Sequence, residues 1–318
     1  MKQRKMDSNY HVPVLFKPAI DGLKLKDDSI VLDMTLGRAG HSSIMLSHIR
    51  KGHLYAIDKD ETALNYSRER LAKIGSNFTL FQGNYSEFTD ILRKEGINEA
   101  DAILLDIGVS SPQFDNPDRG FSYRFDSRLD MRMNCHQELD AYYVVNNYTE
   151  DHLRKIIYEY GEDKSAAKIA RAIVKSRSIR PIETTFELVD VIKSCLPYFV
   201  LNKPGHPAKQ TFQAIRYEVN QEIEELKTGL TKAINFLSLH GRLAIITFNS
   251  LEDKIAKNII KEFTQLPSTN RHMPPNLNVE SIKFTRVTKK PIIPTDEEIL
   301  NNPRSKSAKL RIIERTGK

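Results

Sequence analysis

The sequence predicts an α/β protein, a parallel doubly wound sheet interrupted by an inserted all-helical domain. Two observations carry this prediction. Apolar runs of strand length alternate with helical patterns up to residue 106, an alternation that is typical of parallel sheets. The alternation stops between about residues 115 and 209, where only helical patterns and loops occur, and an apolar strand returns at 241–248.

The elements expected in the first part of the chain follow from the period of the apolar residues and from the turn residues between them. They are a helix over 13–23, strands at 30–34, 53–57, 78–81 and 102–105, and helices over about 42–50 and 61–74. Ligands of open α/β sheets bind beyond the carboxyl ends of the strands. The strand ends are therefore the places to search for a site.

The later part of the chain is expected to hold the insert and the rest of the sheet. Its expected elements are helices over 151–160, 164–175, 185–196, 213–239 and 251–263, strands at 241–248 and 279–288, and a proline-rich loop over 267–278. We expect the last strand to finish the sheet as a hairpin, and the basic tail to dock through Leu310, Ile312 and Ile313. The core then comprises residues 1–114 and 210–318, and the helical insert residues 115–209.

Composition narrows the class of protein. The 318 residues include 48 Lys and Arg against 41 Asp and Glu, and the net charge of +7 mildly favours a polyanionic partner. The two cysteines, Cys135 and Cys195, lack the spacing of metal ligands and are typical of a reduced cytosol. No apolar run has membrane-spanning length, and the first residues lack the apolar region of a secretory signal. We expect a cytoplasmic protein without metal or membrane.

Several strand ends carry residues that suit a ligand. Gly37 and Gly40 follow the first strand and precede a helix, where small residues let a ligand approach the backbone. Asp58 ends the second strand, about where a nucleotide-binding fold places its ribose-binding carboxylate, and Asp106 ends the fourth. Each aspartate alone is explained as well by a turn acid. Together with the glycine loop they indicate a nucleoside cofactor.

One helix of the insert is informative. Lys164, Lys168, Arg171 and Lys175 are spaced four, three and four residues apart, so they share one helix face. No carboxylate occurs from Lys164 through Arg180, and the phosphates of a nucleic acid would balance this charge. The alternative is a solvated face that pairs with acids elsewhere in the fold. The missing acids and the basic tail favour nucleic acid.

Two further segments are expected near the ligand. The helix that re-enters the core carries Gln213 and Arg216 on one face, and we assign Arg216 to nucleic-acid binding. Asn249 and Ser250 follow the strand at 241–248 directly, so this loop faces the site. Ser250 with Asp253 also matches a helix-capping pattern, and we expect Ser250 to cap the next helix.

Long motifs in a fixed order make the sequence recognisable. They are HVPVL, DMTLGRAGHS, AIDKD, DIGVSSPQFDNPDRGFS, LDMRM, YGED, HPAKQTFQAIRYEVNQE, ITFNSLED and NPRSKSAKLR, and they run from His11 to Arg311. The chain resembles the bacterial small-subunit ribosomal RNA (cytosine-N4) methyltransferases. The resemblance implies a Rossmann-like class I methyltransferase core that uses S-adenosylmethionine, with a helical insert that helps to hold the RNA.

The resemblance also implies a substrate and site residues. The substrate is a cytidine in the decoding centre of small-subunit RNA, within an assembled or nearly assembled subunit. The cofactor contacts carried over by position are Ala39, Gly40, His41, Asp58, Tyr85, Asp106 and Gln113. Asp106 is also the first candidate for the acceptor that localises the lone pair of the cytosine amine, with cofactor binding alone as the alternative. Asn249 is the second candidate catalytic residue.

The chain departs from the family pattern at three places. Ala39 stands where glycine is usual, which requires that its φ stays below zero. Asn249 replaces a histidine and cannot titrate between pH 5 and 8, and Lys209-Gln210 replaces Thr-Arg. A second interpretation is therefore a ribosome-assembly RNA-binding factor of this fold whose turnover is weakened or lost. A nicotinamide enzyme is disfavoured, because the strict glycine spacing is absent.

Overall fold

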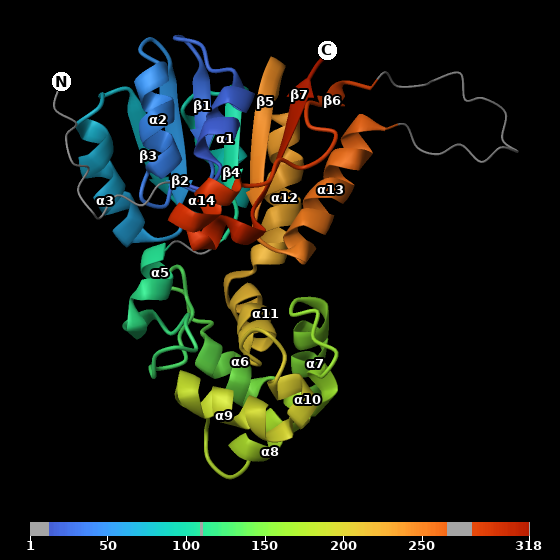
Figure 1. The fold of residues 1–318 in the computed structure, drawn as a ribbon. Helices are drawn as coiled ribbons and strands as arrows, with labels where there is room; N and C mark the ends of the chain where they lie inside the picture. The colour runs from blue at the N-terminus through green and yellow to red at the C-terminus, as the bar shows by residue number, and fades with distance from the viewer. Residues whose placement is uncertain (1–12, 109–110, 266–281, 318) are drawn as a thin grey trace, which may run out of the picture. The chain divides into compact units, whose positions relative to one another are not determined.

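The structure is a computed structural model, and it describes residues 13–108, 111–265 and 282–317. The chain divides into two compact units, Met1–Gly108 with Glu225–Lys318, and Val109–Glu224. The first unit is α/β and the second is helical, as the sequence predicts (Figure 1). The observed division differs from the expected limits of 115 and 209, because helix α11 (Lys209–Asn220) packs with the helices of the second unit.

Within the described residues, one seven-stranded sheet forms the centre of the first unit, in the order β3-β2-β1-β4-β5-β7-β6. The strands are β1 (Ile30–Asp33), β2 (His53–Asp58), β3 (Phe78–Gln82), β4 (Ala100–Asp106), β5 (Leu237–Thr247), β6 (Phe284–Arg286) and β7 (Lys309–Arg315). The first five strands run parallel, and β7 is antiparallel to both β5 and β6. The strand order reverses at β1, so the sheet is doubly wound as predicted.

The end of the sheet differs from the prediction. β6 falls inside the expected range of 279–288, but it does not form a simple hairpin with the preceding strand. The tail, expected only to dock, is strand β7 and lies between β5 and β6. Its residues Leu310, Ile312 and Ile313 are buried in the sheet's two cores. The predicted proline-rich loop over 267–278 lies outside the described residues.

The helical run expected over 213–239 is broken in the structure. It consists of α11 and α12 (Glu222–Asn235), separated by Gln221, whose φ of 53° is left-handed. Residues from Leu237 onward belong to β5, so the strand begins four residues before the predicted Gly241. A left-handed residue ends one helix and redirects the chain, and no glycine marks this position in the sequence.

Helices cover both faces of the sheet, because successive strand residues point to opposite sides. On one face Leu32, Ile103 and Ile245 pack with α4 (Phe88–Lys94), α12 and α13 (Ser250–Thr264). On the other face Val31, Leu104 and Ile246 pack with three earlier helices. These are α1 (Phe16–Leu23), α2 (Gly40–His48) and α3 (Glu61–Ala72). Figure 1 shows this three-layer arrangement in the upper part of the ribbon.

The short elements of the first unit complete its frame. They are η1 (Tyr85–Glu87) after β3, and α14 (Asp296–Asn301) with η3 (Pro303–Ser307) between β6 and β7. No helix in the described part of the chain is long and apolar enough to cross a membrane.

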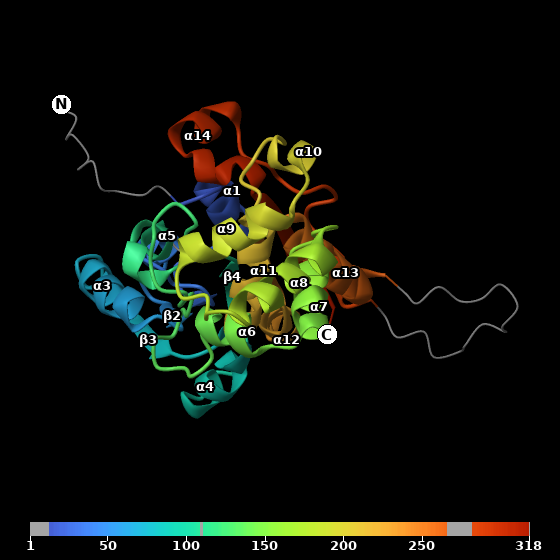
Figure 2. The same ribbon diagram turned by 90° about the horizontal axis from the view of Figure 1, so that it is seen from below.

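The second unit is a cluster of helices with its own core (Figure 2). Its elements are α5 (Ser111–Asp115), η2 (Pro117–Arg119), α6 (Ala141–Asn147), α7 (Glu150–Glu159), α8 (Ala166–Arg177), α9 (Thr185–Cys195), α10 (Tyr198–Leu201) and α11. The three helices predicted here match α7, α8 and α9 to within two residues. The shorter helices α5, α6 and α10 were not predicted, since four to seven residues are too few to show a helical period.

Candidate functional site

Three neighbouring parallel strands of the first unit end in aspartate. Asp33 ends β1, Asp58 ends β2 and Asp106 ends β4, and these strands are adjacent in the order β2-β1-β4. The carboxyl ends of parallel neighbours meet at one edge of the sheet, where ligands of such folds bind. The two predicted acids, Asp58 and Asp106, therefore lie at one edge, on either side of Asp33.

The carboxylate of Asp58 holds the glycine loop. Its Oδ2 accepts a hydrogen bond from the backbone N of Gly37 at 2.7 Å, and its Oδ1 accepts one from the backbone N of Asp60 at 2.9 Å. The hydroxyl of Ser67 donates to the carbonyl of Gly37 at 2.8 Å. Burial raises the pKa of Asp58 to about 6, and these hydrogen bonds oppose that rise. Asp58 therefore fixes the loop in addition to any contact with a ligand.

Ala39 is left-handed, with φ 54° and ψ 36°, and it is fully buried. The expectation that its φ stays below zero is wrong. Its backbone N donates to the carbonyl of Leu36 at 2.8 Å, and its own carbonyl accepts from the backbone N of Ser43 at 2.9 Å. These bonds impose a conformation that costs a residue with a Cβ about 1–2 kcal/mol. The chain thus keeps the backbone shape of a glycine at this position.

Gly40 and His41 begin α2 against the segment that precedes α1. A Cβ at Gly40 would lie 2.6 Å from Cγ of Pro13, so a close approach within the protein explains the glycine. Nε2 of His41 lies 3.1 Å from the carbonyl oxygen of Val14, and a carbonyl only accepts, so Nε2 carries the proton and Nδ1 is an acceptor. Burial lowers the pKa of His41 to about 4, so the ring is neutral at pH 7.

Asp33 is satisfied inside the protein. Its Oδ2 accepts a hydrogen bond from the hydroxyl of Ser42 at 2.5 Å, and its Oδ1 accepts one from the backbone N of Thr35 at 3.1 Å. Burial raises the pKa of Asp33 to about 6. Oγ1 of Thr35 in turn accepts from the backbone N of Asp106 at 2.7 Å. The end of β1 therefore positions the aspartate at the end of β4.

Asp106 differs from the other two acids, because one of its oxygens is unsatisfied. Oδ2 lies 3.5 Å from Nδ1 of His41, whereas Oδ1 is buried and accepts no hydrogen bond from any residue that the structure describes. Burial is the main reason that the pKa of Asp106 rises to about 8, and the nearby carboxylates of Asp33 and Glu252 contribute to this rise. An unpaired buried oxygen is rare in proteins, and at a strand end it suits a ligand that carries a hydrogen-bond donor.

Tyr85 follows β3 and packs against α12. A Cβ at Gly229 would lie 2.6 Å from Cδ2 of the Tyr85 ring. The next residue is fastened to the same helix, since Oε2 of Glu225 accepts from the backbone N of Ser86 at 3.3 Å and Nζ of Lys232 donates to its carbonyl at 2.8 Å. Glu225, Gly229 and Lys232 are four and three residues apart, so they share one face of α12. This face fixes the position of Tyr85.

Asn249 is the N-cap of α13, and its Oδ1 accepts a hydrogen bond from the backbone N of Glu252 at 3.0 Å. The prediction that Ser250 caps this helix is wrong, because Ser250 is already its first residue. The buried Glu252 completes the turn, since its Oε2 accepts from the backbone N of Phe248 at 2.8 Å. Asn249 therefore has a structural task at the edge of the sheet, and its catalytic role stays a prediction.

Gln113 is the remaining predicted cofactor contact. It lies in α5 of the second unit and is buried. The other predicted contacts, from Ala39 to Asp106, all belong to the first unit. The part of Gln113 in cofactor binding therefore stays a prediction.

The basic stripe at α8 has the predicted placement for three of its four cations. Its exposed cations are Lys164, Lys168, Arg171 and Lys175. Lys168, Arg171 and Lys175 lie on the helix opposite the buried Ile169 and Ile173, whereas Lys164 precedes the first residue of α8, contrary to the prediction. Arg171 lies 3.7 Å from Glu150, and the three lysines form no ion pair with any described residue. The alternative interpretation, a solvated face that pairs with acids elsewhere in the fold, is therefore correct for Arg171 but not for the three lysines.

Arg216 is placed differently from the expectation. Its Nε and Nη2 donate to Oε1 and Oε2 of Glu222 at 2.8 and 3.0 Å, and both side chains are almost buried. Its guanidinium also lies 4.7 Å from the ring centroid of Tyr217. An arginine held in this way braces its own unit, so its placement lends no support to the predicted RNA contact.

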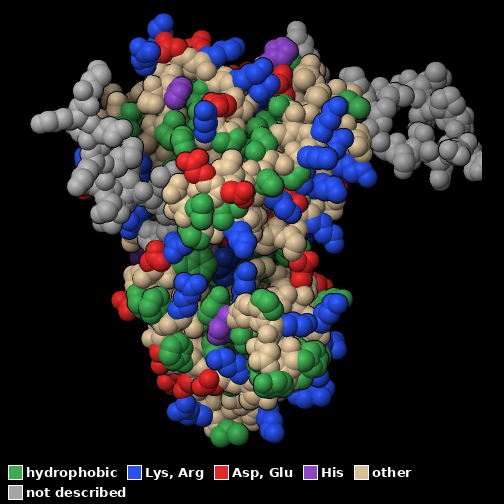
Figure 3. All heavy atoms as spheres, in the orientation of Figure 1, with side chains coloured by type: hydrophobic (Ala, Val, Ile, Leu, Met, Phe, Trp, Pro, Cys, Tyr) green, Lys and Arg blue, Asp and Glu red, His purple; other side chains and the backbone are tan. Residues whose placement is uncertain are grey.

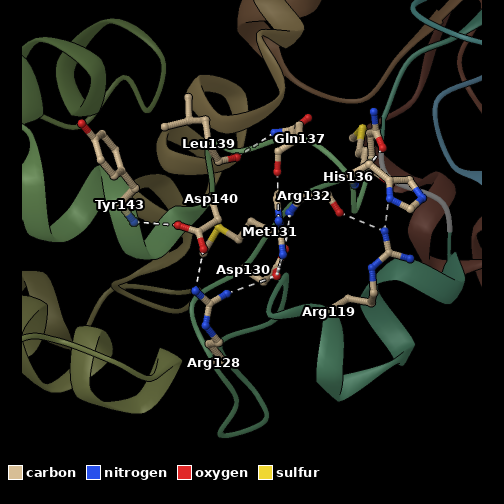
Figure 4. Close-up of polar contacts among 12 residues, drawn as sticks. Arg119, Arg128, Asp130, Met131, Arg132, His136, Gln137, Leu139, Asp140 and Tyr143 are labelled. Atoms are coloured by element: carbon tan, nitrogen blue, oxygen red, sulfur yellow. Dashed lines mark hydrogen bonds and ion pairs between the residues drawn. The ribbon is translucent and has the colours of Figure 1, made fainter.

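A polar network explains two of the motifs found in the sequence, NPDRG and LDMRM (Figure 4). Arg128 pairs with Asp140 at 2.7 Å, and Arg132 pairs with Asp130 at 2.7 Å. Arg119 donates to the carbonyl of Arg132 at 2.9 Å. These bonds tie the segment between η2 and α6 to itself. The two motifs therefore include residues that shape the second unit.

Comparison with known proteins identifies the family. A model described as the MraW methylase family matches residues 8–316. The chain belongs to the MraW methylase family. Three relatives named ribosomal RNA small subunit methyltransferase H are similar over nearly their whole length. The one from Fusobacterium nucleatum subsp. nucleatum is 48% identical over 312 residues, which is 98% of each chain.

The other two relatives have similar identity and coverage. The Mesoplasma florum protein is 48% identical over 309 residues, 96% of this chain and 99% of its own. The Exiguobacterium sibiricum protein is 46% identical over 305 residues, 96% of this chain and 98% of its own. The resemblance inferred from the motifs is confirmed.

The sequence analysis did not select several residues of this MraW-family site. Asp33, Thr35 and Ser42 form the hydrogen-bonded support of Asp106, and Gly229 receives the ring of Tyr85. Asp33 had a usable signal, because it ends its strand as Asp58 and Asp106 end theirs. Gly229 had none, since a glycine inside a helical pattern does not reveal which ring packs on it.

Proposed function

We propose that this protein transfers the methyl group of S-adenosylmethionine to the exocyclic N4 amine of a cytidine in small-subunit ribosomal RNA. Membership of the MraW methylase family supports the reaction class, and its relatives named above carry small-subunit ribosomal RNA in their names. The structural observation that supports it most is the buried, unpaired Oδ1 of Asp106 at the carboxyl edge of the sheet.

The residues at this edge fit S-adenosylmethionine. Oδ1 of Asp106 is an acceptor without a donor among the described residues, and the cofactor brings ammonium and hydroxyl donors. Asp58, Tyr85, Asp106 and the backbone of 39–41 would hold it, with Gln113 of the second unit as a further contact. When bound, the cofactor supplies a methyl group on a positively charged sulfur.

The task of the protein is to position the amine and to manage its proton. The lone pair of the cytosine amine is delocalised into the ring, so the amine is a poor nucleophile, and holding it in line with the methyl group lowers the barrier. A positive charge near Asp106 lowers the pKa of its carboxyl from about 8 and favours the carboxylate. That carboxylate can accept a hydrogen bond from the amine, which helps to localise the lone pair.

The atoms of the reaction balance without a strong base. The amine nitrogen would receive the methyl group that bound S-adenosylmethionine supplies, and the cofactor would leave as a neutral thioether. The nitrogen becomes acidic only as its new bond forms, so its proton passes to the carboxylate of Asp106 or to water. A cysteine nucleophile is not required, and both cysteines, Cys135 and Cys195, belong to the second unit.

We also infer the context of the reaction. The four cations of the α8 stripe would hold RNA phosphates, and the second unit would serve to recognise the RNA. The substrate would be an assembled or nearly assembled small subunit, and the protein would act in the cytoplasm, where ribosomes are found. No observation favours the alternative of an inactive assembly factor, since two of the three departures, Ala39 and Asn249, are built into hydrogen-bonded turns.

Mass spectrometry of the modified nucleosides tests this proposal. Small subunits from a strain that lacks the gene are incubated with the protein and methyl-labelled S-adenosylmethionine. We expect label in N4-methylcytidine, and none with the Asp106→Ala variant. Label in 5-methylcytidine, or no label with the native protein, would contradict the proposal. Comparing intact subunits with deproteinised RNA shows which assembly state is the substrate.

A further inference from the structure

A groove lined by cations lies between α13 and the last strands of the first unit. We call it the α13–β6 groove. Its volume is about 40 Å³, more than the roughly 10–15 Å³ that one water molecule needs. The cations that line it are Lys257, Arg286, Lys289 and Arg311. The rest of its lining is one threonine and two isoleucines, so no acid lines it.

The charge of the groove is only partly balanced within the protein. Arg311 donates to both carboxylate oxygens of Asp253, at 2.7 and 3.1 Å. Lys257, Arg286 and Lys289 are exposed and form no ion pair with any described residue. Further Lys and Arg side chains surround the groove, and Figure 3 shows them gathered over α13 and β6. Three exposed cations without an ion-pair partner among the described residues therefore line the same groove.

The fold brings these cations together from four places in the sequence. Lys257 lies on α13, Arg286 on β6, Lys289 just after it and Arg311 on β7. The edge-to-face contact of Phe263 with Phe284, 5.4 Å between ring centroids, holds α13 against β6. Like charges close together repel, so the arrangement is unfavourable unless an anion is bound between them.

We propose that the α13–β6 groove binds backbone phosphates of the RNA substrate. An RNA phosphate supplies the negative charge and the acceptor oxygens that the three cations lack, and an arginine can bind it through two donors. Lys257 lies seven residues along α13 from Ser250, roughly 10 Å from the edge where the target base is expected. Such a site would hold nucleotides next to the target. This inference rests on the proposed RNA substrate and adds a contact surface in the first unit.

A matched pair of triple variants tests the groove. The test variant carries Lys257→Gln, Arg286→Gln and Lys289→Gln. The control carries Arg68→Gln, Lys73→Gln and Lys94→Gln. These exposed residues lie on α3, at its C-cap and on α4, and their replacement removes the same charge. Binding of each full-length protein to deproteinised small-subunit RNA is measured over a range of salt concentrations. Titration with S-adenosylhomocysteine checks that both variants keep the cofactor site.

The expected result separates the groove from general charge. Each lost phosphate contact on single-stranded RNA lowers the magnitude of the slope of log affinity against log salt by about 0.7. The slope of the test variant should therefore be smaller than the native slope by about 2, and the slope of the control should change far less. RNA affinity at low salt should fall about tenfold or more in the test variant, with S-adenosylhomocysteine affinity unchanged. Equal slopes in the two variants would overturn the proposal.

Two further outcomes are distinct. In the first, the native protein binds inorganic phosphate, the test variant does not, and the salt slope of RNA binding is the same in the test and control variants. The groove is then a site for a small anion, and the proposal fails. If the native protein transfers no methyl group to RNA but the test variant still loses its slope, the proposed function fails and the groove stands.

Discussion

Nδ1 of His41 lies 3.5 Å from Oδ2 of Asp106, and the two side chains have matching protonation states. The pKa of His41 is lowered to about 4 and that of Asp106 is raised to about 8, in both cases mainly because of burial. At pH 7 the protonated carboxyl of Asp106 therefore faces a neutral imidazole, and Nδ1 of this ring can accept a hydrogen bond from the carboxyl group. The contact orients Asp106 and leaves Oδ1 for a ligand.

The raised pKa of Asp106 predicts how stability depends on pH. The folded protein keeps this proton between about pH 4 and 8, whereas the unfolded chain loses it, so stability falls as pH rises through that window. The Asp106→Asn variant is neutral at every pH. Its free energy of unfolding should exceed that of the native protein at pH 8–9 by on the order of a few kcal/mol.

Chemical unfolding at several pH values, without cofactor, measures this difference. The two proteins should converge as the pH falls below 3.8, the ordinary pKa of the carboxyl, because it is then protonated in both states. Parallel profiles from pH 4 to 9 would show that Asp106 is ionised in the folded protein. The variant should also lose methyl transfer, because an amide cannot become the carboxylate acceptor.

The left-handed Ala39 predicts that glycine stabilises the protein. The Ala39→Gly variant removes the Cβ that opposes φ 54°, and its unfolding free energy should rise by about 1 kcal/mol. The control is Ala167→Gly, on the exposed face of α8, which should lower stability by about 0.5–1 kcal/mol. Thermal unfolding compares the two. A fall in stability for Ala39→Gly would mean that the methyl group packs better than its strain costs.

The contact of Gly229 with Tyr85 predicts a loss of cofactor affinity. In Gly229→Ala the new methyl group would meet the Tyr85 ring at 2.6 Å, so the ring must move. Overpacking of this kind costs about 1–3 kcal/mol, more than the roughly 1 kcal/mol that alanine gains in a helix. Calorimetric titration should show weaker S-adenosylhomocysteine binding. Thr228→Ala, exposed on the same helix, should leave it unchanged.

The α8 stripe predicts a second loss of RNA affinity. Changing Lys164, Lys168, Arg171 and Lys175 to glutamine should weaken RNA binding and reduce its salt slope by about 2–3. Cofactor affinity should stay constant, because none of the four cations is a proposed cofactor contact. Filter binding at several salt concentrations gives the slope. If it keeps the native value, the stripe is a solvated face.

The capping bond of Asn249 predicts the effect of restoring histidine. Asn249→His loses a preferred N-cap and should cost about 1 kcal/mol of stability. Its single-turnover rate near pH 7 should differ little from that of the native protein, because the methylated amine loses its proton readily. Asn249→Asp keeps the cap and serves as the stability control. A faster Asn249→His variant with a pH inflection near 6.5 would instead assign the family histidine to proton removal.

The sequence by itself determined the order of the first five strands and the positions of Asp58 and Asp106 at two strand ends. Strand ends, glycine loops and helical periods depend on neighbouring residues, and they are visible in a single sequence. The doubly wound sheet follows from that order, since a strand, a helix and a parallel strand connect in one hand. The motifs also predicted the family, and the comparison with known proteins confirmed that prediction.

Only the tertiary structure decided how distant segments meet. The tail became strand β7 because its apolar residues fill a gap between β5 and β6, which no local pattern shows. Ala39 is left-handed, against its own preference, within a loop that Asp58 of β2 holds through the backbone N of Gly37. The pKa of Asp106 is raised because the surrounding core buries its carboxyl, and because Asp33 and Glu252 lie close to it in space. Contacts of this kind determine the protonation of buried groups and the strain of the backbone. They join residues that are far apart in the sequence, so a local sequence pattern cannot predict them.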